Sequence, residues 1–159
     1  MNSSRRSHED PPAIARLGWR YHHLGIPHGS PRRGERHLQQ LGVHVCGFET
    51  SPYGIEWMRF DPHCPVPEIV KTVPHLAFAV DDLDVALEGK EILIPPNSPS
   101  QGVRVAFIVD DGAPIELLEL TQAENDRVVQ THLHRSGRPG RAGGSLAIHE
   151  QIGHPHCDS

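Results

Sequence analysis

The sequence predicts an α+β fold made of two βαβββ-type modules, the first of them abbreviated. One observation is a repeated histidine strand: His23-Leu24-Gly25-Ile26 and His75-Leu76-Ala77-Phe78 both read as histidine, leucine, small residue and large apolar residue. The other is a repeated glutamate strand, Ile55-Glu56-Trp57-Met58 and Ile115-Glu116-Leu117-Leu118, which follows each histidine strand. Because both strands recur in the same order, one structural unit is used twice.

The second histidine strand, within residues 71–80, has two unlike faces. Side chains alternate along a strand. One face therefore carries the histidine and two small side chains, His75, Ala77 and Ala79. The opposite face is apolar, with Leu76, Phe78 and Val80. A single histidine in such a place is more often a partly exposed strand-end residue than a ligand. The repeated order His23, Glu56, His75, Glu116 is what favours a functional site.

Composition divides the chain into three segments. The 159 residues are enough for one domain with a real core. Nearly all large apolar residues lie between residues 19 and 120, the predicted folded domain, with module one at about 19–62 and module two at about 71–120. The polar leader 1–18 and the low-complexity tail 121–159 are expected to be disordered. For the tail, a solvated segment is preferred over a zinc site at His154, His156 and Cys157.

Charge and cysteine content narrow the class of protein. The formal net charge is -5 and no dense basic stripe is present, which argues against nucleic-acid binding. The three cysteines lack paired spacing, as is typical of reduced thiols. No apolar run approaches the length of a membrane span, and the N-terminus has no signal-like apolar region. We therefore expect a soluble, cytoplasmic protein that binds neither nucleic acid nor membrane.

Module one begins with a strand at residues 21–26, and a helix is predicted from about Pro31 to Leu41. Ser30 followed by Pro31 is typical of a helix start, and Gly42 is typical of a helix end. The apolar face of this helix is thin, so the helix must pack against a sheet to persist.

Two more strands of module one are predicted at residues 43–49 and 54–60. In the second, Glu56 shares a face with Met58 and Phe60. A carboxylate on an apolar face is unfavourable without a partner. This position is the first sign that Glu56 has a role.

Module two repeats the pattern with clearer signals. Asp82 is predicted to cap a short helix that ends at Gly89. A turn-rich stretch covers residues 95–102, and Asp111-Gly112 predicts a hairpin. Strands are predicted at residues 91–94, 103–109 and 115–120.

The four repeated residues form a plausible metal-ligand set. Two neutral imidazoles and two carboxylates suit a divalent ion such as Zn, Ni, Fe(II), Mn or Co and leave positions open for substrate. Each candidate sits on a strand, which fixes its direction. The alternative is that each glutamate pairs with a nearby Lys or Arg and each histidine is an ordinary strand residue.

The two modules resemble the vicinal oxygen chelate superfamily, which includes glyoxalase I, methylmalonyl-coenzyme A epimerase, extradiol dioxygenases and the fosfomycin and bleomycin resistance proteins. The resemblance covers about Tyr21 to Leu120 and is strongest at Pro-His-Leu-Ala-Phe-Ala-Val-Asp-Asp (74–82) and Pro-Ile-Glu-Leu-Leu-Glu-Leu (114–120). It implies a curved mixed sheet around a cleft and, in many members, a homodimer. Its implied metal ligands are His23, Glu56, His75 and Glu116.

The resemblance also implies a function. It suggests a metal-dependent glyoxalase-like lyase, isomerase or epimerase that acts on a small oxygenated or thioester substrate through an enediolate or enolate, with Glu116 or Glu56 moving the proton. The alternatives are an Fe(II) extradiol-type dioxygenase and a non-catalytic small-molecule binding protein of the bleomycin-resistance kind. The register of the first strand leaves open whether His22 or His23 faces the cleft. Possible substrate-side groups are Arg59, Arg104, His28 and His63, each also a plausible surface residue.

Overall fold

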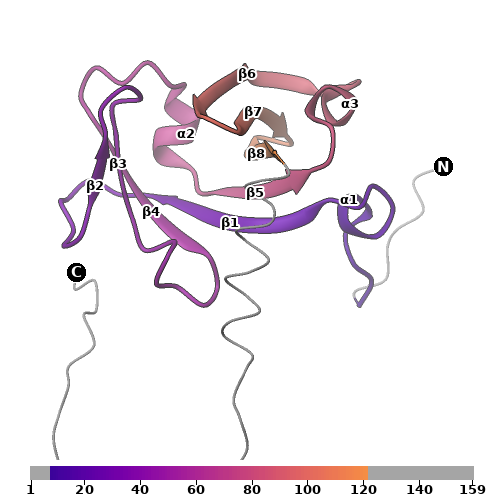
Figure 1. Cartoon of the computed structure of the whole chain (residues 1–159), viewed down its shortest axis with the longest axis horizontal. Helices are drawn as coiled ribbons and strands as arrows, with labels where there is room; N and C mark the ends of the chain where they lie inside the picture. The colour runs from indigo at the N-terminus through magenta and orange to yellow at the C-terminus, as the bar shows by residue number, and fades with distance from the viewer. Residues whose placement is uncertain (1–7, 122–159) are drawn as a thin grey trace, which may run out of the picture.

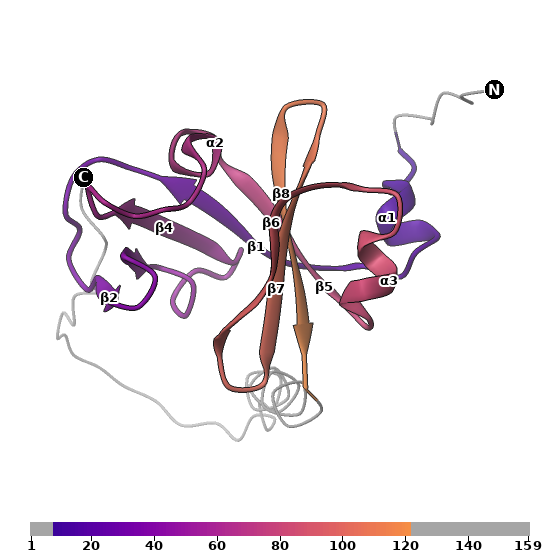
Figure 2. The same ribbon diagram turned by 90° about the horizontal axis from the view of Figure 1, so that it is seen from above.

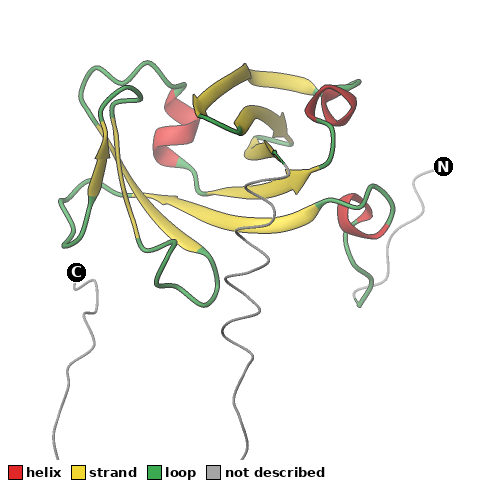
Figure 3. Cartoon of the chain, in the orientation of Figure 1, coloured by secondary structure: helices red, strands yellow, loops and turns green. Residues whose placement is uncertain are grey.

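The computed structural model describes residues 8–121, in which eight strands form one mixed sheet and the helices are short (Figure 1, Figure 3). The elements are α1 (Pro12–Ala15), β1 (Arg20–Pro27), β2 (Arg36–Leu38), β3 (Val43–Cys46), β4 (Ile55–Phe60), α2 (Glu68–Thr72), β5 (His75–Val80), α3 (Leu83–Leu87), β6 (Glu91–Ser100), β7 (Val103–Asp110) and β8 (Ala113–Leu120).

The strand order β2-β3-β4-β1-β5-β8-β7-β6 consists of two equivalent halves. In each half the first strand pairs in parallel with the last, β1 with β4 and β5 with β8, and the two halves join through the antiparallel pair β1–β5. Figure 1 shows β1 and β5 side by side, with β2, β3 and β4 on the left and β6, β7 and β8 above β5. In Figure 2 module one lies to the left, and the strands of module two cross β5 at the centre of the view. The predicted α+β fold of two modules with a curled mixed sheet is therefore confirmed.

The repeat extends to the strand register. Within each module, the glutamate lies opposite the residue two positions after the histidine: Gly25 pairs with Glu56, and Ala77 with Glu116. Across the β1–β5 junction, each histidine lies opposite that same position of the other module, with His23 opposite Ala77 and His75 opposite Gly25. Because one face of a strand carries every second residue, this register directs all four side chains of the repeat to the same side of the sheet.

The helix predicted at residues 31–41 was wrong. The chain instead turns at Gly34, where φ is +81°, and then forms the three-residue strand β2. The start and end signals are local, whereas Leu38 and Leu41 are too few to hold a helix on the sheet; they pack into the core of Val43, Val45 and Cys64. Module one therefore keeps all four strands, and the part it lacks is the helix.

A second correction concerns β6, which was predicted to end at Ile94 but runs on to Ser100 through the turn-rich stretch. Prolines are tolerated here because β6 is an edge strand, where a missing ladder N–H costs little. The pairing with β7 shifts register several times along this stretch. The side-chain amide of Asn97 donates to the carbonyl of Val105 at 3.4 Å, which helps to hold the irregular part.

In module two, the structure contains the predicted helix cap and the predicted hairpin turn. The Asp82 carboxylate accepts a hydrogen bond from the backbone N–H of Val85 at 3.0 Å and caps α3. Asp111 and Gly112, with φ of 47° and 77°, make the tight turn between β7 and β8. The helix α3 covers the outer face of this half of the sheet, and its buried residues join a core that includes Phe78, Ile108 and Leu117.

Two short helices were not predicted. The helix α1 lies within the leader for which disorder was expected; Ala13 packs against the core of module two, and the N–H of Trp19 donates to its carbonyl at 3.0 Å. The helix α2 precedes the second histidine strand. The low-complexity tail and its candidate zinc residues lie outside the described residues. Within residues 8–121, no helix has the length and apolar character that a membrane span requires.

Candidate metal site

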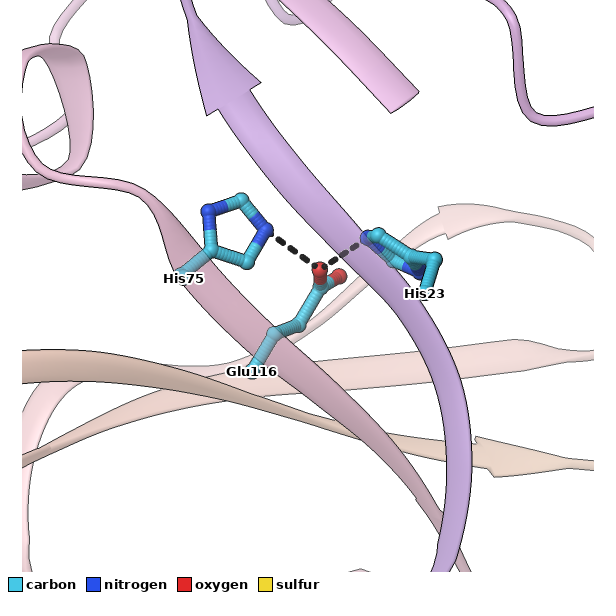
Figure 4. A group of neighbouring side chains, drawn as sticks. All are labelled: His23, His75 and Glu116. Carbon is cyan, nitrogen blue, oxygen red and sulfur yellow. Dashed lines mark ion pairs between the residues drawn. The ribbon is translucent and has the colours of Figure 1, made fainter. Parts of the chain in front are cut away.

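Three side chains of the predicted quartet converge at the junction of the modules (Figure 4). They come from β1, β5 and β8: the Nε2 atoms of His23 and His75 lie 3.1 and 3.3 Å from the same oxygen, Oε2 of Glu116. One donor atom from each residue lies within 4.8 Å of the other two. The three residues therefore form a compact two-histidine, one-carboxylate group.

Glu56 lies at the margin of this group. Its Oε2 is 3.5 Å from Nε2 of His23, and it is not one of the three compactly placed donors. Its side chain is only 18% exposed and faces the same cavity as Glu116. The structure thus brings all four predicted residues together, with Glu56 at the edge of the group.

The histidine nitrogens are poorly satisfied by the protein alone. Nε2 of His23 and both ring nitrogens of His75 are buried, and none of them makes a contact with the geometry of a hydrogen bond. Unsatisfied buried polar groups cost free energy, whereas imidazole nitrogens beside a carboxylate are good ligands for a divalent transition ion. The donor set therefore fits the predicted metal.

Burial and neighbouring charges shift the pKa values of the two glutamates in opposite directions. Burial acts to raise the pKa of Glu116, but the imidazoles of His23 and His75 outweigh it and lower this pKa to about 2. Burial also raises the pKa of Glu56, and there the more distant imidazoles compensate only in part. Glu116 therefore stays ionised, while Glu56 accepts a proton more readily. Such divergent pKa values are typical of an acid–base site.

The first strand resolves the choice between the neighbouring histidines. A β-bulge between Tyr21 and His23 interrupts the pairing with β5, so that the register of β1 changes at His22. His23 is the residue that faces Glu116. His22 stacks on Phe48, and its Nδ1 lies 2.8 Å from Nδ1 of His23.

The contact between the two histidines orients His23. If Nε2 of His23 binds an ion, its Nδ1 carries a hydrogen and donates it to Nδ1 of His22. Burial, together with the neighbouring His23, lowers the pKa of His22 to about 4, so His22 is neutral and can accept a hydrogen bond. His22 is therefore placed to fix the tautomer of His23 when an ion is bound.

Replacing His22 with phenylalanine should weaken metal binding by about tenfold, because outer-shell partners of ligating histidines contribute on this scale. Phenylalanine keeps the stacking on Phe48 but removes the acceptor. Calorimetric titration with Zn²⁺ measures the change. His22→Asn, whose amide oxygen can take the place of Nδ1, should restore most of the affinity; equal affinities for the wild type and the phenylalanine variant would contradict the assigned role.

Gly25 makes room for the second histidine. A Cβ at this position would lie 2.1 Å from Cε1 of His75, far inside contact distance. We expect Gly25→Ala to displace the His75 ring and to reduce Zn²⁺ affinity at least about tenfold. Gly29→Ala is the matched control because a Cβ there meets nothing within 4 Å. Equal zinc affinities for the two alanine variants would show that the ring does not need this space.

A cavity of about 870 Å³ is lined by three of the four residues, His23, Glu56 and Glu116. Its size is that of small-molecule sites, and both modules line it, so the predicted cleft is present. Its polar lining includes His22, His23, Glu56, Glu116 and Arg36, and its apolar lining includes Met58, Phe60, Val105, Phe107 and Leu118.

The predicted substrate-side groups do not line this cavity. Arg59 and Arg104 are bound by carboxylates, Arg59 by Glu35 and Arg104 by Asp84 and Glu119. Neither His28 nor His63 is among the lining residues. The cation that does reach the cavity is Arg36, which the sequence reasoning missed because it placed this residue in a helix. As a strand, residues 36–38 would have put Arg36 and Leu38 on one face.

Comparison with protein-family models and with curated proteins gives no match. Among solved structures, the chain is similar to the hypothetical protein BH1468 from Bacillus halodurans C-125, with 19% identity and a TM-score of 0.51 over 65% of this chain and 96% of that one. It also matches methylmalonyl-CoA epimerase from Mycobacterium tuberculosis, with 19% identity and a TM-score of 0.47 over 67% of this chain and 91% of that one. The likeness to BH1468 is a likeness of fold. The paired-module topology agrees with the architecture that the resemblance to the vicinal oxygen chelate superfamily implied.

Proposed function

We propose that this chain is a metal-dependent lyase, isomerase or epimerase that moves a proton next to a carbonyl group of a small oxygenated or thioester substrate. The observation that supports the proposal most strongly is that one site holds both a group suited to bind a metal ion and a carboxylate free to transfer a proton. A compact ligand group stands beside a second carboxylate that is not needed to complete it.

In this proposal His23, His75 and Glu116 hold a divalent ion such as Zn, Ni, Fe, Mn or Co. When bound, the ion supplies Lewis acidity toward adjacent oxygen atoms of the substrate. The three strands fix the ligands, and His22 holds the tautomer of His23. The depressed pKa of Glu116 keeps it available as an anionic ligand at neutral pH.

Glu56 is the proposed general base. It lines the cavity in which a substrate would lie, and burial raises its pKa toward the range in which a carboxylate removes carbon-bound protons efficiently. Removal of the proton leaves an enolate or enediolate on the substrate. Return of this proton from Glu56 to the neighbouring carbon gives an isomer, and delivery of a proton from water to the opposite face gives an epimer. Arg36 supplies positive charge to the same cavity.

The proposal is tested first by metal analysis of the purified protein. We expect the cavity to hold about one tightly bound equivalent, so that His75→Ala and Glu116→Gln each contain about one equivalent less than the wild type. Unchanged metal content in both variants would contradict the proposal. Proton transfer is tested next with small α-hydroxy ketones and thioesters in deuterated water. Deuterium should enter the carbon next to the carbonyl with the wild-type metalloprotein and not with Glu56→Gln.

A second function is favoured by one observation. Two histidines and one carboxylate with open positions are also the ligand set of non-haem Fe(II) oxygenases. Oxygen uptake by the Fe(II)-loaded protein in the presence of a catechol tests this alternative. Uptake that survives in Glu56→Gln would favour the dioxygenase, because that reaction does not depend on the additional carboxylate.

A further inference from the structure

We propose a second divalent-ion site, on the outer face of module one, in which His37, His44 and Asp61 bind Zn²⁺ or an ion of similar ligand preference. This site is independent of the proposed function. It uses none of the residues of the cavity site.

The three residues lie on the face of the sheet that points away from the cavity. On β2, β3 and β4, alternate residues line the cavity, namely Arg36, Leu38, Val43, Val45, Glu56, Met58 and Phe60. The residues between them therefore face outward. His37 pairs directly with His44, and His44 with Arg59, so that a row of polar side chains crosses the three strands. Asp61 continues this face two residues after Arg59.

The donor atoms of this group converge. Nε2 of His37 is 2.9 Å from Oδ2 of Asp61, and Nε2 of His44 is 3.0 Å from Oδ1 of the same carboxylate. One donor atom from each residue lies within 4.8 Å of the other two. The two imidazole rings are parallel, with centroids 4.0 Å apart, and their Nε2 atoms contact the two oxygens of one carboxylate. A two-histidine, one-carboxylate group at this spacing is a ligand set for Zn²⁺ and its neighbours.

The backbone holds Asp61 in position. Its N–H donates to the carbonyl of Gly42 at 2.8 Å, and its carbonyl accepts from the N–H of Cys64 at 3.0 Å. These bonds fix the chain on both sides of the carboxylate. With His37 and His44 on paired strands, the three residues are already close together, and the two rings need only turn out of their parallel stack to direct both Nε2 atoms at one ion. Such proximity favours binding.

A second carboxylate stands behind one of the rings. Oε2 of Glu35 lies 3.8 Å from Nδ1 of His44, on the side opposite Asp61. A carboxylate at the far nitrogen is the usual outer partner of a metal-ligating histidine. Arg59 holds Glu35 through contacts as short as 2.6 Å and offsets its charge. With neutral imidazoles, Asp61 and Glu35 against Arg59 leave one excess negative charge, which favours a divalent cation.

The site also has a structural consequence. In module two the outer face is apolar and is covered by α3, whereas module one has no helix between β1 and β2. An ion shared by β2, β3 and the residue after β4 would fasten the three-residue edge strand β2 to the sheet. His37 is partly exposed, with 40% of its side chain accessible, so an ion can enter from solvent.

The test is Zn²⁺ titration of the full chain after removal of bound metal, by calorimetry, in four proteins. The variant His37→Asn/His44→Asn should bind one equivalent fewer than wild type, or bind it about 100-fold more weakly. The cavity variant Glu116→Gln should keep that equivalent, together with a zinc-dependent rise of Tm of about 5 °C. His63→Asn, which removes an exposed histidine close to Asp61 in the sequence, is the matched control and should behave as wild type. Since all four proteins carry the same residues 122–159, binding there cancels.

Equal stoichiometry, affinity and Tm shift in wild type and in the double variant would overturn the proposal. A second measurement avoids dependence on how the double variant folds. In the Glu116→Gln protein, with ¹⁵N-labelled imidazoles, stoichiometric Zn²⁺ should shift the Nε2 resonances of His37 and His44 by tens of ppm. Absence of these shifts would show that Asp61 and the two rings form only a hydrogen-bonded cluster.

Discussion

Glu116→Gln should reduce the affinity for the divalent ion of the cavity by at least about 100-fold and should abolish activity that depends on the ion. The expected effect is large because Oε2 of Glu116 lies between both histidines, so that its loss removes the one anionic ligand of the compact group. The amide of glutamine keeps the shape but carries no charge, and its oxygen is a weaker ligand for a transition ion.

Metal analysis and zinc titration of the cavity site measure this effect, with Glu91→Gln as a matched control on the exposed start of β6. Circular dichroism checks that the variant is folded. A folded Glu116→Gln protein that retains the cavity metal at wild-type affinity would show that the carboxylate is not a ligand. The cluster of His37 and His44 is unchanged in this variant and can still bind zinc. Comparison with the variant His37→Asn/His44→Asn shows how much of the remaining zinc is bound there.

The part of the site that could be predicted from sequence is the part encoded twice. His23 and His75, like Glu56 and Glu116, occupy equivalent positions in two modules, and the pairing register repeats this equivalence. A motif that occurs twice therefore predicts contacts between residues that are distant in the sequence, because equivalent strands pair and bring their side chains together. The two-module fold is predicted by the same repeat.

The helix predicted at residues 31–41 failed for the opposite reason. The helix start and end signals are local, at Ser30, Pro31 and Gly42. They carry no information about the surface against which a helix would pack. In module two, Phe78 and Ile108 supply an apolar outer face for α3. In module one the corresponding face carries the polar His44 and Arg59, and the guanidinium of Arg32 covers its Trp57, so less apolar surface is left for a helix to bury.

Two features of the site depend on irregular geometry that no motif encodes. The β-bulge in β1 decides that His23 faces Glu116 and that His22 stands behind it, because a bulge changes the register at one residue. Arg36 reaches the cavity only because residues 36–38 form an edge strand. The orientation of the two histidines and the position of Arg36 both depend on pairing with strands that are distant in the sequence. This pairing cannot be read from a single sequence.

Glu56→Gln should separate catalysis from metal binding. Because Glu56 lies outside the compact donor group, we expect metal affinity to change by less than about tenfold. Loss of a general base should slow deuterium exchange into substrate by about 10³-fold. In the wild type, the rate should fall as pH drops through the raised pKa of Glu56, since only the ionised carboxylate accepts the proton. A Glu56→Gln variant that retains full exchange activity would remove Glu56 from the mechanism.

The stability of the metal-free protein supplies an independent check on the same residue. A carboxyl group whose pKa is raised by folding favours the folded state in its protonated form, so this contribution is lost as pH rises from the unfolded value through the folded one. At neutral pH the ionised Glu56 should therefore destabilise the fold, and Glu56→Gln should unfold at an equal or higher temperature than wild type in chelator. A variant that is less active but at least as stable is the signature of a residue kept for chemistry, whereas a large fall in Tm would assign Glu56 a structural role.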